Sequence, residues 1–316
     1  MLQSILVPLD GSQLAECVLP HAMAVARSFD AQIKLLCILE KHGVNGPAPL
    51  FDLVNWQIKK RKTSLYLEKI KKGFQESGLQ AHATVAEGLV AEEITKIAQS
   101  QRVNLIILSS HGRNGLTSWG ISSTSQKIIL SAPTSVFIVR ANQPQAGRLS
   151  EAPLYQRILV PLDGSQRAEN VLPVITQLAR FHQSQVHFVQ VVQTPELARK
   201  MPLTEDDIDL SSRLVARNQQ EARHYLEQFK SHSYLEGLSV RTHLITSNNT
   251  AAELHQLVNL QQINLVALSA HGYSGNQQWP YGSIASNFMM YGKSHLMIIQ
   301  DLPAQIGTTF SERPER

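Results

Sequence analysis

The chain repeats nine residues without change, and this repeat limits its possible folds more than any other feature. Residues 5–13 read Ile-Leu-Val-Pro-Leu-Asp-Gly-Ser-Gln, and residues 158–166 read the same nine letters 153 positions later. Solenoids repeat every roughly 20–50 residues, so this spacing matches a whole domain instead. We therefore expect two copies of one domain in tandem within the 316 residues.

Each repeat has the pattern of a buried strand that runs into a turn and a helix. Ile5-Leu6-Val7 and its copy are apolar without alternation, which is typical of a parallel strand covered on both faces. Asp-Gly-Ser then predicts a turn whose Asp or Ser caps the next helix. Asp10 and Asp163 therefore stand at the carboxyl end of the first strand, where open α/β sheets bind ligands. A purely structural role as helix caps fits this position equally well.

Apolar patterning predicts the same alternation of strands and helices in both copies. The expected strands of the first copy span 4–8, 32–39, 79–85, 103–109 and 135–140, and its helices 14–28, 55–77, 91–101 and 123–130. The expected strands of the second copy span 157–161, 185–192, 238–245, 263–269 and 295–300, and its helices 167–180, 211–230, 251–260 and 283–291. Right-handed crossovers then give an α/β fold with a five-stranded parallel sheet in each copy.

Proline and glycine mark the segments between these elements. Pro20 and the matching Pro173 are expected to kink the first helix of each copy. Residues 41–49 and 194–209 are expected loops. The predicted domains are 1–141 and 156–303, with a linker at 142–155 and a polar tail at 304–316.

Composition excludes several classes of protein. The net charge is only +4, and no basic run is interleaved with aromatic residues, so a nucleic-acid partner is not expected. No apolar run approaches the roughly 20 residues of a membrane span. Cys17 and Cys37 lie in apolar segments without CxxC spacing, which indicates buried thiols in a reducing compartment. With a strand starting at once and no room for a signal peptide, we expect a cytoplasmic protein.

A glycine loop after the fourth strand is the second shared feature. Ser109-Ser110-His111-Gly112 in the first copy matches Ser269-Ala270-His271-Gly272 in the second. Ten residues beyond each glycine, a helix begins at Ser122-Ser123 or at Gly282-Ser283. Glycine lets the backbone approach an anion closely, and a helix N-terminus offers unpaired amides, so the loop suits a phosphate. A plain tight turn between strand and helix is the alternative.

The chain resembles the universal stress protein family in a tandem, two-domain form. The resemblance rests on Val7–Ser12 and its repeat, on the two Ser-x-His-Gly segments and on Ser131-Ala132-Pro133 before the last strand. It implies two Rossmann-like domains, similar to adenine-nucleotide alpha-hydrolases. It also implies that the last strands, 135–140 and 295–300, pair within the chain as an intramolecular pseudo-dimer.

The resemblance also implies a ligand and a set of residues. In the ATP-binding branch of the family, phosphates lie on a loop Gly-x2-Gly-x9-Gly-(Ser/Thr), and the adenine and ribose lie near the first-strand Asp and an apolar residue of the second strand. The implied nucleotide-binding residues of the second copy are Pro161, Leu162, Asp163, Val191, Ser269, His271, Gly272, Gly282, Ser283 and Ile284. Those of a weaker site in the first copy are Pro8, Leu9, Asp10, Ile38, Ser109, His111, Gly112, Ser122 and Ser123.

The two copies depart unequally from that loop pattern. Serine replaces the first glycine at Ser269, and it replaces two glycines in the first copy, at Ser109 and Ser122. A side chain at Ser122 is expected to narrow the space for a phosphate or to demand a different backbone angle. The second copy is therefore predicted to hold the better site.

Three functions follow from these observations. The first is a stress-response regulatory module that binds ATP or ADP, with Mg²⁺ as a candidate companion, and acts on unidentified protein partners. The second is a nucleotide-independent interaction protein of the same fold. The third is a slow ATPase, but no Gly-x-Ser-x-Gly elbow or HExxH spacing is present, so no catalytic or metal residue is assigned. A homodimer of pseudo-dimers is compatible with each.

Overall fold

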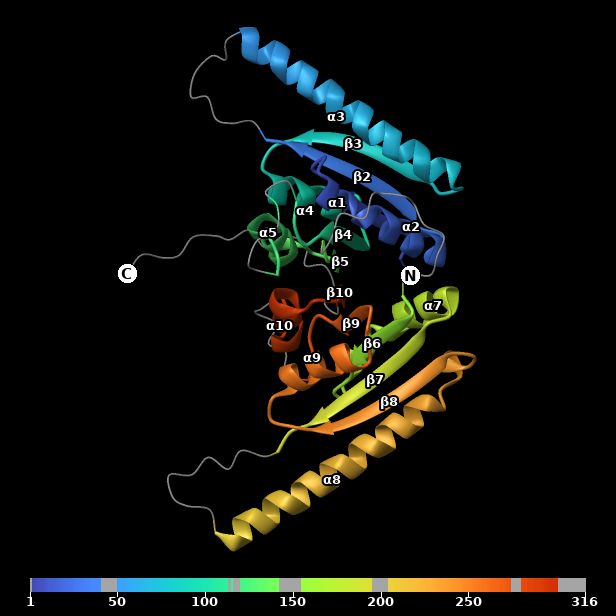
Figure 1. Cartoon of the computed structure of the whole chain (residues 1–316), viewed down its shortest axis with the longest axis vertical. Helices are drawn as coiled ribbons and strands as arrows, with labels where there is room; N and C mark the ends of the chain where they lie inside the picture. The colour runs from blue at the N-terminus through green and yellow to red at the C-terminus, as the bar shows by residue number, and fades with distance from the viewer. Residues whose placement is uncertain are drawn as a thin grey trace, which may run out of the picture.

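A computed structural model describes residues 2–40, 50–112, 115, 120–141, 155–194, 204–273 and 280–300. These residues form two α/β domains that share one ten-stranded sheet (Figure 1). We call the part from β1 (Ser4–Pro8) to β5 (Ser135–Val139) the first domain and the part from β6 (Arg157–Pro161) to β10 (His295–Ile299) the second domain. The two long helices, α3 (Leu50–Glu76) and α8 (Glu205–Lys230), lie at opposite ends of the molecule (Figure 1).

Each domain contributes five strands to the sheet. The first-domain strands are β1 (Ser4–Pro8), β2 (Gln32–Leu39), β3 (Ala81–Glu87), β4 (Leu105–Ser109) and β5 (Ser135–Val139). The second-domain strands are β6 (Arg157–Pro161), β7 (Gln185–Val192), β8 (Ser239–Thr246), β9 (Leu265–Ser269) and β10 (His295–Ile299). The strand order is β3-β2-β1-β4-β5-β10-β9-β6-β7-β8.

The two domains join through their last strands. All described strand pairs within a domain are parallel, whereas β5 and β10 pair antiparallel, with Phe137 opposite Met297. This confirms the predicted fold and the predicted pairing of the last strands within the chain. The pairing also protects two strand edges that a single domain would expose.

The helices repeat in the same way. Those of the first domain are α1 (Gln13–Glu16), α2 (Val18–Phe29), α3 (Leu50–Glu76), α4 (Val90–Ser100) and α5 (Ser123–Ser131). Those of the second domain are α6 (Gln166–Glu169), α7 (Leu172–His182), α8 (Glu205–Lys230), the 3-10 helix η1 (Ser233–Leu235), α9 (Thr250–Leu260) and α10 (Ser283–Tyr291).

The prediction of one kinked first helix in each copy was wrong. The chain instead makes a single turn, breaks at Cys17 or at Asn170, and starts a new helix. Pro20 and Pro173 therefore stand in the first turn of that new helix. A first-turn amide has no intrahelical partner, so a residue without an amide hydrogen costs little there.

The predicted starts of the long helices were also late. α8 begins at Glu205, within the expected loop 194–209, because Thr204 and Asp207 form a capping box. α3 begins at Leu50 rather than at residue 55, and the expected loop 41–49 lies outside the described residues. The strands β3, β4 and β9 each begin two residues later than predicted.

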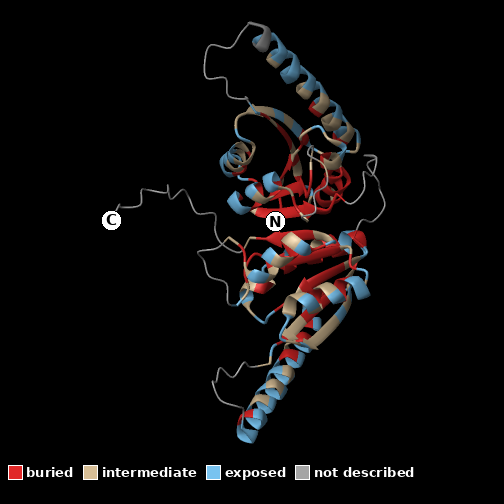
Figure 2. Cartoon of the chain, turned by 60° about the vertical axis from the view of Figure 1, so that its left-hand side comes forward, coloured by how far each residue is buried: buried red, intermediate tan, exposed pale blue. Residues whose placement is uncertain are grey.

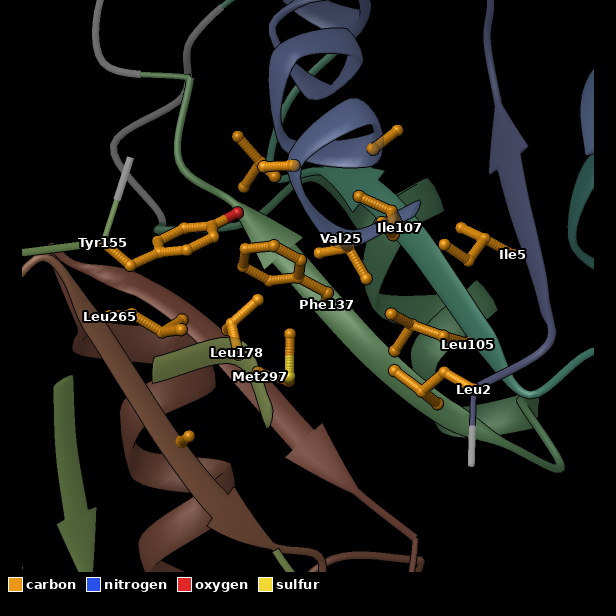
Figure 3. Close-up of a cluster of buried hydrophobic side chains, with 14 of the residues drawn as sticks. Leu2, Ile5, Val25, Leu105, Ile107, Phe137, Tyr155, Leu178, Leu265 and Met297 are labelled. Carbon is orange, nitrogen blue, oxygen red and sulfur yellow. The ribbon is translucent and has the colours of Figure 1, made fainter. Parts of the chain in front are cut away.

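The core continues across the boundary between the domains. Buried residues concentrate in the middle of the sheet, whereas the outer faces of α3 and α8 are exposed (Figure 2). Figure 3 shows Tyr155 and Phe137 beside Met297 in one cluster of buried side chains. Tyr155, at the end of the expected linker, is fully buried, and its hydroxyl lies 2.9 Å from Nδ1 of His21. Cys17 and Cys37 are buried free thiols, as predicted.

Candidate functional site

A cavity of about 1180 Å³ lies at the carboxyl ends of β6, β7 and β9 in the second domain. This is the edge of the sheet where open α/β folds bind ligands. All ten residues predicted for this domain line the cavity: Pro161, Leu162, Asp163, Val191, Ser269, His271, Gly272, Gly282, Ser283 and Ile284. The fold thus brings four separate segments of the chain around one hollow.

Asp163 holds the turn after β6. Its Oδ1 accepts hydrogen bonds from the amide of Ser165 at 3.0 Å and from the hydroxyl of Ser165 at 2.6 Å. The other carboxylate oxygen accepts from the amide of Tyr273 at 2.6 Å. Ser165 caps α6, because its hydroxyl oxygen accepts from the amide of Ala168. The cap of α6 is thus Ser165 rather than Asp163, and Asp163 has another structural role, since it ties the turn to the loop after β9.

The glycine of the His-Gly segment makes room for this carboxylate. A methyl group at Gly272 would lie 2.2 Å from Oδ2 of Asp163. In the first domain, a methyl group at Gly112 would lie 2.4 Å from Oδ2 of Asp10. Only a residue without a side chain allows such a close approach of the loop backbone. The Asp-Gly-Ser and His-Gly segments therefore depend on each other in both copies.

The N-terminus of α10 opens onto the same cavity. Gly282 donates its amide to the carbonyl of Ala270 at 2.8 Å and leads into the helix without a side-chain cap. Ser283 and Ile284, in the first turn of α10, line the cavity. First-turn amides have no intrahelical acceptor, and the helix dipole favours an anion beside them. An anionic group in the cavity would therefore meet donors that no capping side chain occupies.

The opposite wall comes from β7 and α8. Val191 offers apolar surface, and Tyr225 of α8 donates its hydroxyl to Glu169 at 2.8 Å. Burial raises the pKa of Tyr225, and the hydrogen bond to Glu169 raises it further, so the phenol stays protonated. The sequence-based prediction missed Tyr225. Its recurrence as Tyr66, also at the cavity of its own domain, was the available signal.

The first domain has a smaller cavity, of about 720 Å³, at the equivalent place. Eight of the nine residues predicted for this domain line it: Pro8, Leu9, Asp10, Ile38, Ser109, His111, Gly112 and Ser122. Ser123 is not part of the lining, whereas Thr124 and Ser125 are. Ser12 caps α1 and donates its amide to Asp10 at 2.9 Å, as Ser165 does to Asp163.

Ser122 caps the N-terminus of α5, whereas Gly282 leaves the matching N-terminus of α10 without a side-chain cap. Its hydroxyl oxygen accepts a hydrogen bond from the amide of Ser125 at 3.1 Å and donates to the hydroxyl of that serine. Of the two expected consequences of a side chain at Ser122, a different backbone angle is not observed, because φ is −71° at both Ser122 and Gly282. The difference between the two sites is a hydroxyl group that takes up an amide of α5.

The serine that replaces the first glycine also differs between the domains. The Ser109 hydroxyl donates to the carbonyl of His111 at 2.5 Å, and the thiol of Cys17 lies 3.6 Å from the Ser109 hydroxyl oxygen. The Ser269 hydroxyl is buried and has no hydrogen-bond partner among the described residues. His111 and His271, both buried, line their cavities beside these serines.

The long helices bring opposite charges to the two cavities. Lys62 lies four residues before Tyr66, and Glu221 lies four residues before Tyr225, so the two positions match. Each lines the cavity of its own domain. Lys59 also lines the first cavity, where the second has Asn218. Lys59 and Lys62 are thus exposed residues that also border a cavity.

Two further expectations concern metals and membranes. Within the described ranges, no three or more His, Cys, Asp or Glu side chains gather as a metal-binding group. None of the described helices has both the length and the apolarity needed to cross a bilayer.

The chain matches a known protein family over most of its length. The sequence model described as the universal stress protein family matches residues 1–140 and 154–299. Universal stress protein YxiE from Bacillus subtilis is 29% identical over 149 residues, which cover 44% of this chain and 100% of that protein. Universal stress protein MJ0531 from Methanocaldococcus jannaschii is 28% identical over 140 residues, which cover 44% of this chain and 82% of that protein.

Solved structures of similar fold cover both domains. The functionally unknown protein PA1789 from Pseudomonas aeruginosa PAO1 superposes with a TM-score of 0.67 at 15% identity, over 95% of this chain and 92% of that one. A universal stress protein in complex with cAMP is 15% identical and covers 44% of this chain and 98% of that one, with a TM-score of 0.33.

Proposed function

The chain belongs to the universal stress protein family, and we propose that it is a cytoplasmic stress-response regulator that binds ATP or ADP in its second domain. The open N-terminus of α10 carries this proposal. Gly282 leaves the first amides of that helix without a side-chain cap at the edge of a cavity of about 1180 Å³. Small-molecule sites commonly have volumes of roughly 300–1,000 Å³, and this cavity is somewhat larger, so it has room for a nucleotide.

Each part of a nucleotide has candidate partners in this cavity. The phosphates would lie on Gly272, Gly282, Ser283 and Ile284, where backbone amides and the helix dipole favour negative charge. The base would lie against the apolar side chain of Val191 and the segment Pro161-Leu162. Asp163 would face the ribose, because a carboxylate has about four acceptor positions and three are used by Ser165 and Tyr273.

The proposal needs no catalytic group. Mg²⁺ would be held chiefly by the phosphates, because Mg²⁺ usually keeps waters and binds with substrate phosphates rather than in an all-protein cage. Asp163 is engaged in holding the loop after β9 through the amide of Tyr273. A binding protein that responds to nucleotide level fits this arrangement better than an ATPase does.

A second candidate function, an interaction protein that does not depend on nucleotide, is favoured by one observation. Ser122 already occupies an amide of α5, and serines replace glycines at both Ser109 and Ser269. If the second domain has lost nucleotide affinity as well, the paired domains would serve as a rigid platform for protein partners.

Steady phosphate release that is lost on Asp163→Ala would favour the third candidate, a slow ATPase.

Calorimetric titration of ATP, ADP, AMP and cAMP, with and without Mg²⁺, tests the proposal. We include cAMP because a universal stress protein has been solved in complex with it. We expect about one site per chain, lost in Gly282→Val and kept in Ser122→Val, the matched change in the first domain. No heat and no thermal stabilisation at millimolar nucleotide, with a folded and initially ligand-free protein, would favour the interaction protein.

A further inference from the structure

The helices that carry the two candidate sites are each capped at the far end by a side chain from the other domain. α5 and α10 lie next to each other close to the centre of the molecule, beside the β5–β10 pair, and pack into one hydrophobic cluster (Figure 1). The last four carbonyls of a helix have no intrahelical partner and need donors from elsewhere. At both helices, one of those donors crosses the domain boundary.

Arg140 supplies the crossing donor for α10. Its Nη2 donates to the carbonyls of Phe288 at 2.7 Å and Met289 at 3.0 Å, both in the last turn of α10. Its Nη1 donates at 2.6 Å to the carbonyl of Gly120, two residues before Ser122. Only 6% of Arg140 is exposed. A buried cation at a helix C-terminus is favoured by the helix dipole, which helps to offset its desolvation.

Gly120 reinforces this contact. A methyl group at Gly120 would lie 2.3 Å from the carbonyl oxygen of Met290. The loop before α5 therefore packs its backbone directly on the end of α10. Arg140 and Gly120 together join the first-domain site to the helix of the second-domain site.

Tyr281 supplies the crossing donor for α5. Its hydroxyl donates to the carbonyl of Ile129 at 3.0 Å, in the last turn of α5. Tyr281 directly precedes Gly282, where α10 begins, and lines the second-domain cavity. Each crossing contact thus lies close to a candidate site. Tyr281, which holds α5, is one residue before Gly282, and Gly120, which Arg140 contacts, is two residues before Ser122.

The two crossings use different residues, so neither is a simple result of the repeat. Directly after β10, the position that matches Arg140 is Gln300, whose Oε1 is buried without a partner among the described residues. In the first domain the position that matches Tyr281 is Ile121, which has no side-chain donor. The duplicated domains have acquired two separate means of fixing the same pair of helices.

We propose that Arg140 and Tyr281 are positioning residues: each holds the C-terminal end of a helix of the other domain, α10 or α5, and thereby sets where the N-terminus of that helix lies. Arg140 fixes the second-domain site and the loop of the first, and Tyr281 fixes α5. The consequence for ligand affinity rests on the proposed function, whereas the consequence for the free protein does not.

Hydrogen exchange in the ligand-free protein is the first arm of the test. Arg140→Gln installs the residue found at the matching position, 300. We expect exchange to become about tenfold faster at the amides of Ser122 and Gly292, which donate to Ser110 and Phe288. Arg140→Lys, which keeps the charge at the helix end, should restore part of the protection. Tyr281→Phe should accelerate exchange at the amide of Ala132, which donates to the carbonyl of Ile129.

Arg157→Gln is the matched control. Its guanidinium also donates to a backbone carbonyl, that of Gln261, but it lies at the amino end of β6, on the other edge of the sheet from the cavities. If Arg140→Gln leaves those amides unchanged, or if Arg157→Gln accelerates them equally, the positioning role is overturned.

Nucleotide affinity is the second arm. Arg140→Gln should weaken ATP or ADP binding by about 3- to 30-fold, with Arg140→Lys intermediate and Arg157→Gln unchanged. Unchanged affinity together with faster exchange would overturn the link to the second-domain site. If the wild-type protein binds no nucleotide, the proposed function fails, and the exchange arm alone supports or overturns the positioning role.

Discussion

The two domains share a backbone but differ in how they end the helix at the candidate site. Ser122 and Gly282 adopt the same φ of −71°, yet the serine hydroxyl accepts the amide of Ser125 while the glycine leaves the first turn of α10 uncapped. The first domain thus stabilises its own helix, and the second keeps the same donors open. A single hydroxyl group therefore separates a structural helix terminus from a candidate anion site.

The boundary between the domains shows a second asymmetry. On one side Arg140 donates its amide to Nδ1 of His295 at 3.1 Å, and on the other Gln300 donates its amide to the hydroxyl of Ser135 at 3.1 Å. The same backbone bond is therefore made by an imidazole on one side and by a hydroxyl on the other. Only the first side can respond to pH.

The largest expected effect follows from this imidazole. Burial, and to a lesser extent the charge of Arg140, together lower the pKa of His295 to about 4, whereas an imidazole in the unfolded chain has a pKa of about 6.5. Between these values the unfolded state binds a proton that the folded state does not. The free energy of unfolding therefore falls as the pH falls from about 6.5 to about 4.

His295→Ser, which copies the residue at position 135, should reduce this loss. We expect the difference in unfolding free energy between pH 7.5 and pH 4.5 to shrink by roughly 2 kcal/mol, measured by denaturant titration at both values. The variant will be less stable at pH 7.5 because it loses packing against His21. Equal acid sensitivity in the two proteins would show that the imidazole does not control the boundary.

The next effect tests whether the two glycines of the loop have different roles. Gly272→Ala should cost about 1–3 kcal/mol and abolish nucleotide binding, because the new methyl group collides with Asp163. Gly112→Ala should cost a similar amount through Asp10. Gly282→Ala is the control within the loop: its methyl group would meet the Ala270 carbonyl at 3.5 Å, an ordinary contact, so stability should change by less than about 0.5 kcal/mol. Thermal unfolding with calorimetry separates the three variants.

Much of the fold was predictable because it depends on local patterns. The unbroken apolar runs at Ile5–Val7 and Ile158–Val160 predicted strands buried on both faces, and the repeat predicted two matching domains. The start of α8 was not found, because Thr204 and Asp207 lie in an acidic, proline-containing stretch typical of a loop. A capping box depends on two residues, three positions apart, that bond to each other's backbone amides, and composition does not show it.

The candidate site was predicted in its residues but not in its contacts. Eighteen of the nineteen named residues line the two cavities, ten in the second domain and eight in the first. The hydrogen bond that makes Ser122 a cap, and the one that ties Asp163 to Tyr273, require coordinates. The contrast between Lys62 and Glu221 also stayed hidden, because matching them requires the register of helices whose lengths and loops differ between the copies.

Exchanging the two helix-capping residues tests the main contrast directly. Gly282→Ser should place a hydroxyl at the first turn of α10, stabilise the protein by a few tenths of a kcal/mol and weaken nucleotide binding by about tenfold. Ser122→Gly should lower stability by a similar small amount and open α5. Calorimetry on both single variants and on the exchanged pair measures the effect. If Gly282→Ser binds nucleotide as the wild type does, the uncapped terminus is not what distinguishes the domains.

The smallest expected effect concerns the charges that the long helices bring to the cavities. Glu221→Lys copies Lys62 and should strengthen ATP binding to the second domain by about 2- to 5-fold, because exposed charges are worth about 0.2–1 kcal/mol. The side chain of Glu221 is 63% exposed and already paired with Arg217 at 2.9 Å, which keeps the effect small. The gain should disappear at about 1 M salt, where the Debye length is about 3 Å. Glu221→Gln, which removes charge without reversing it, should give roughly half the gain, and a gain that persists at high salt would mean that the lysine contacts the ligand directly.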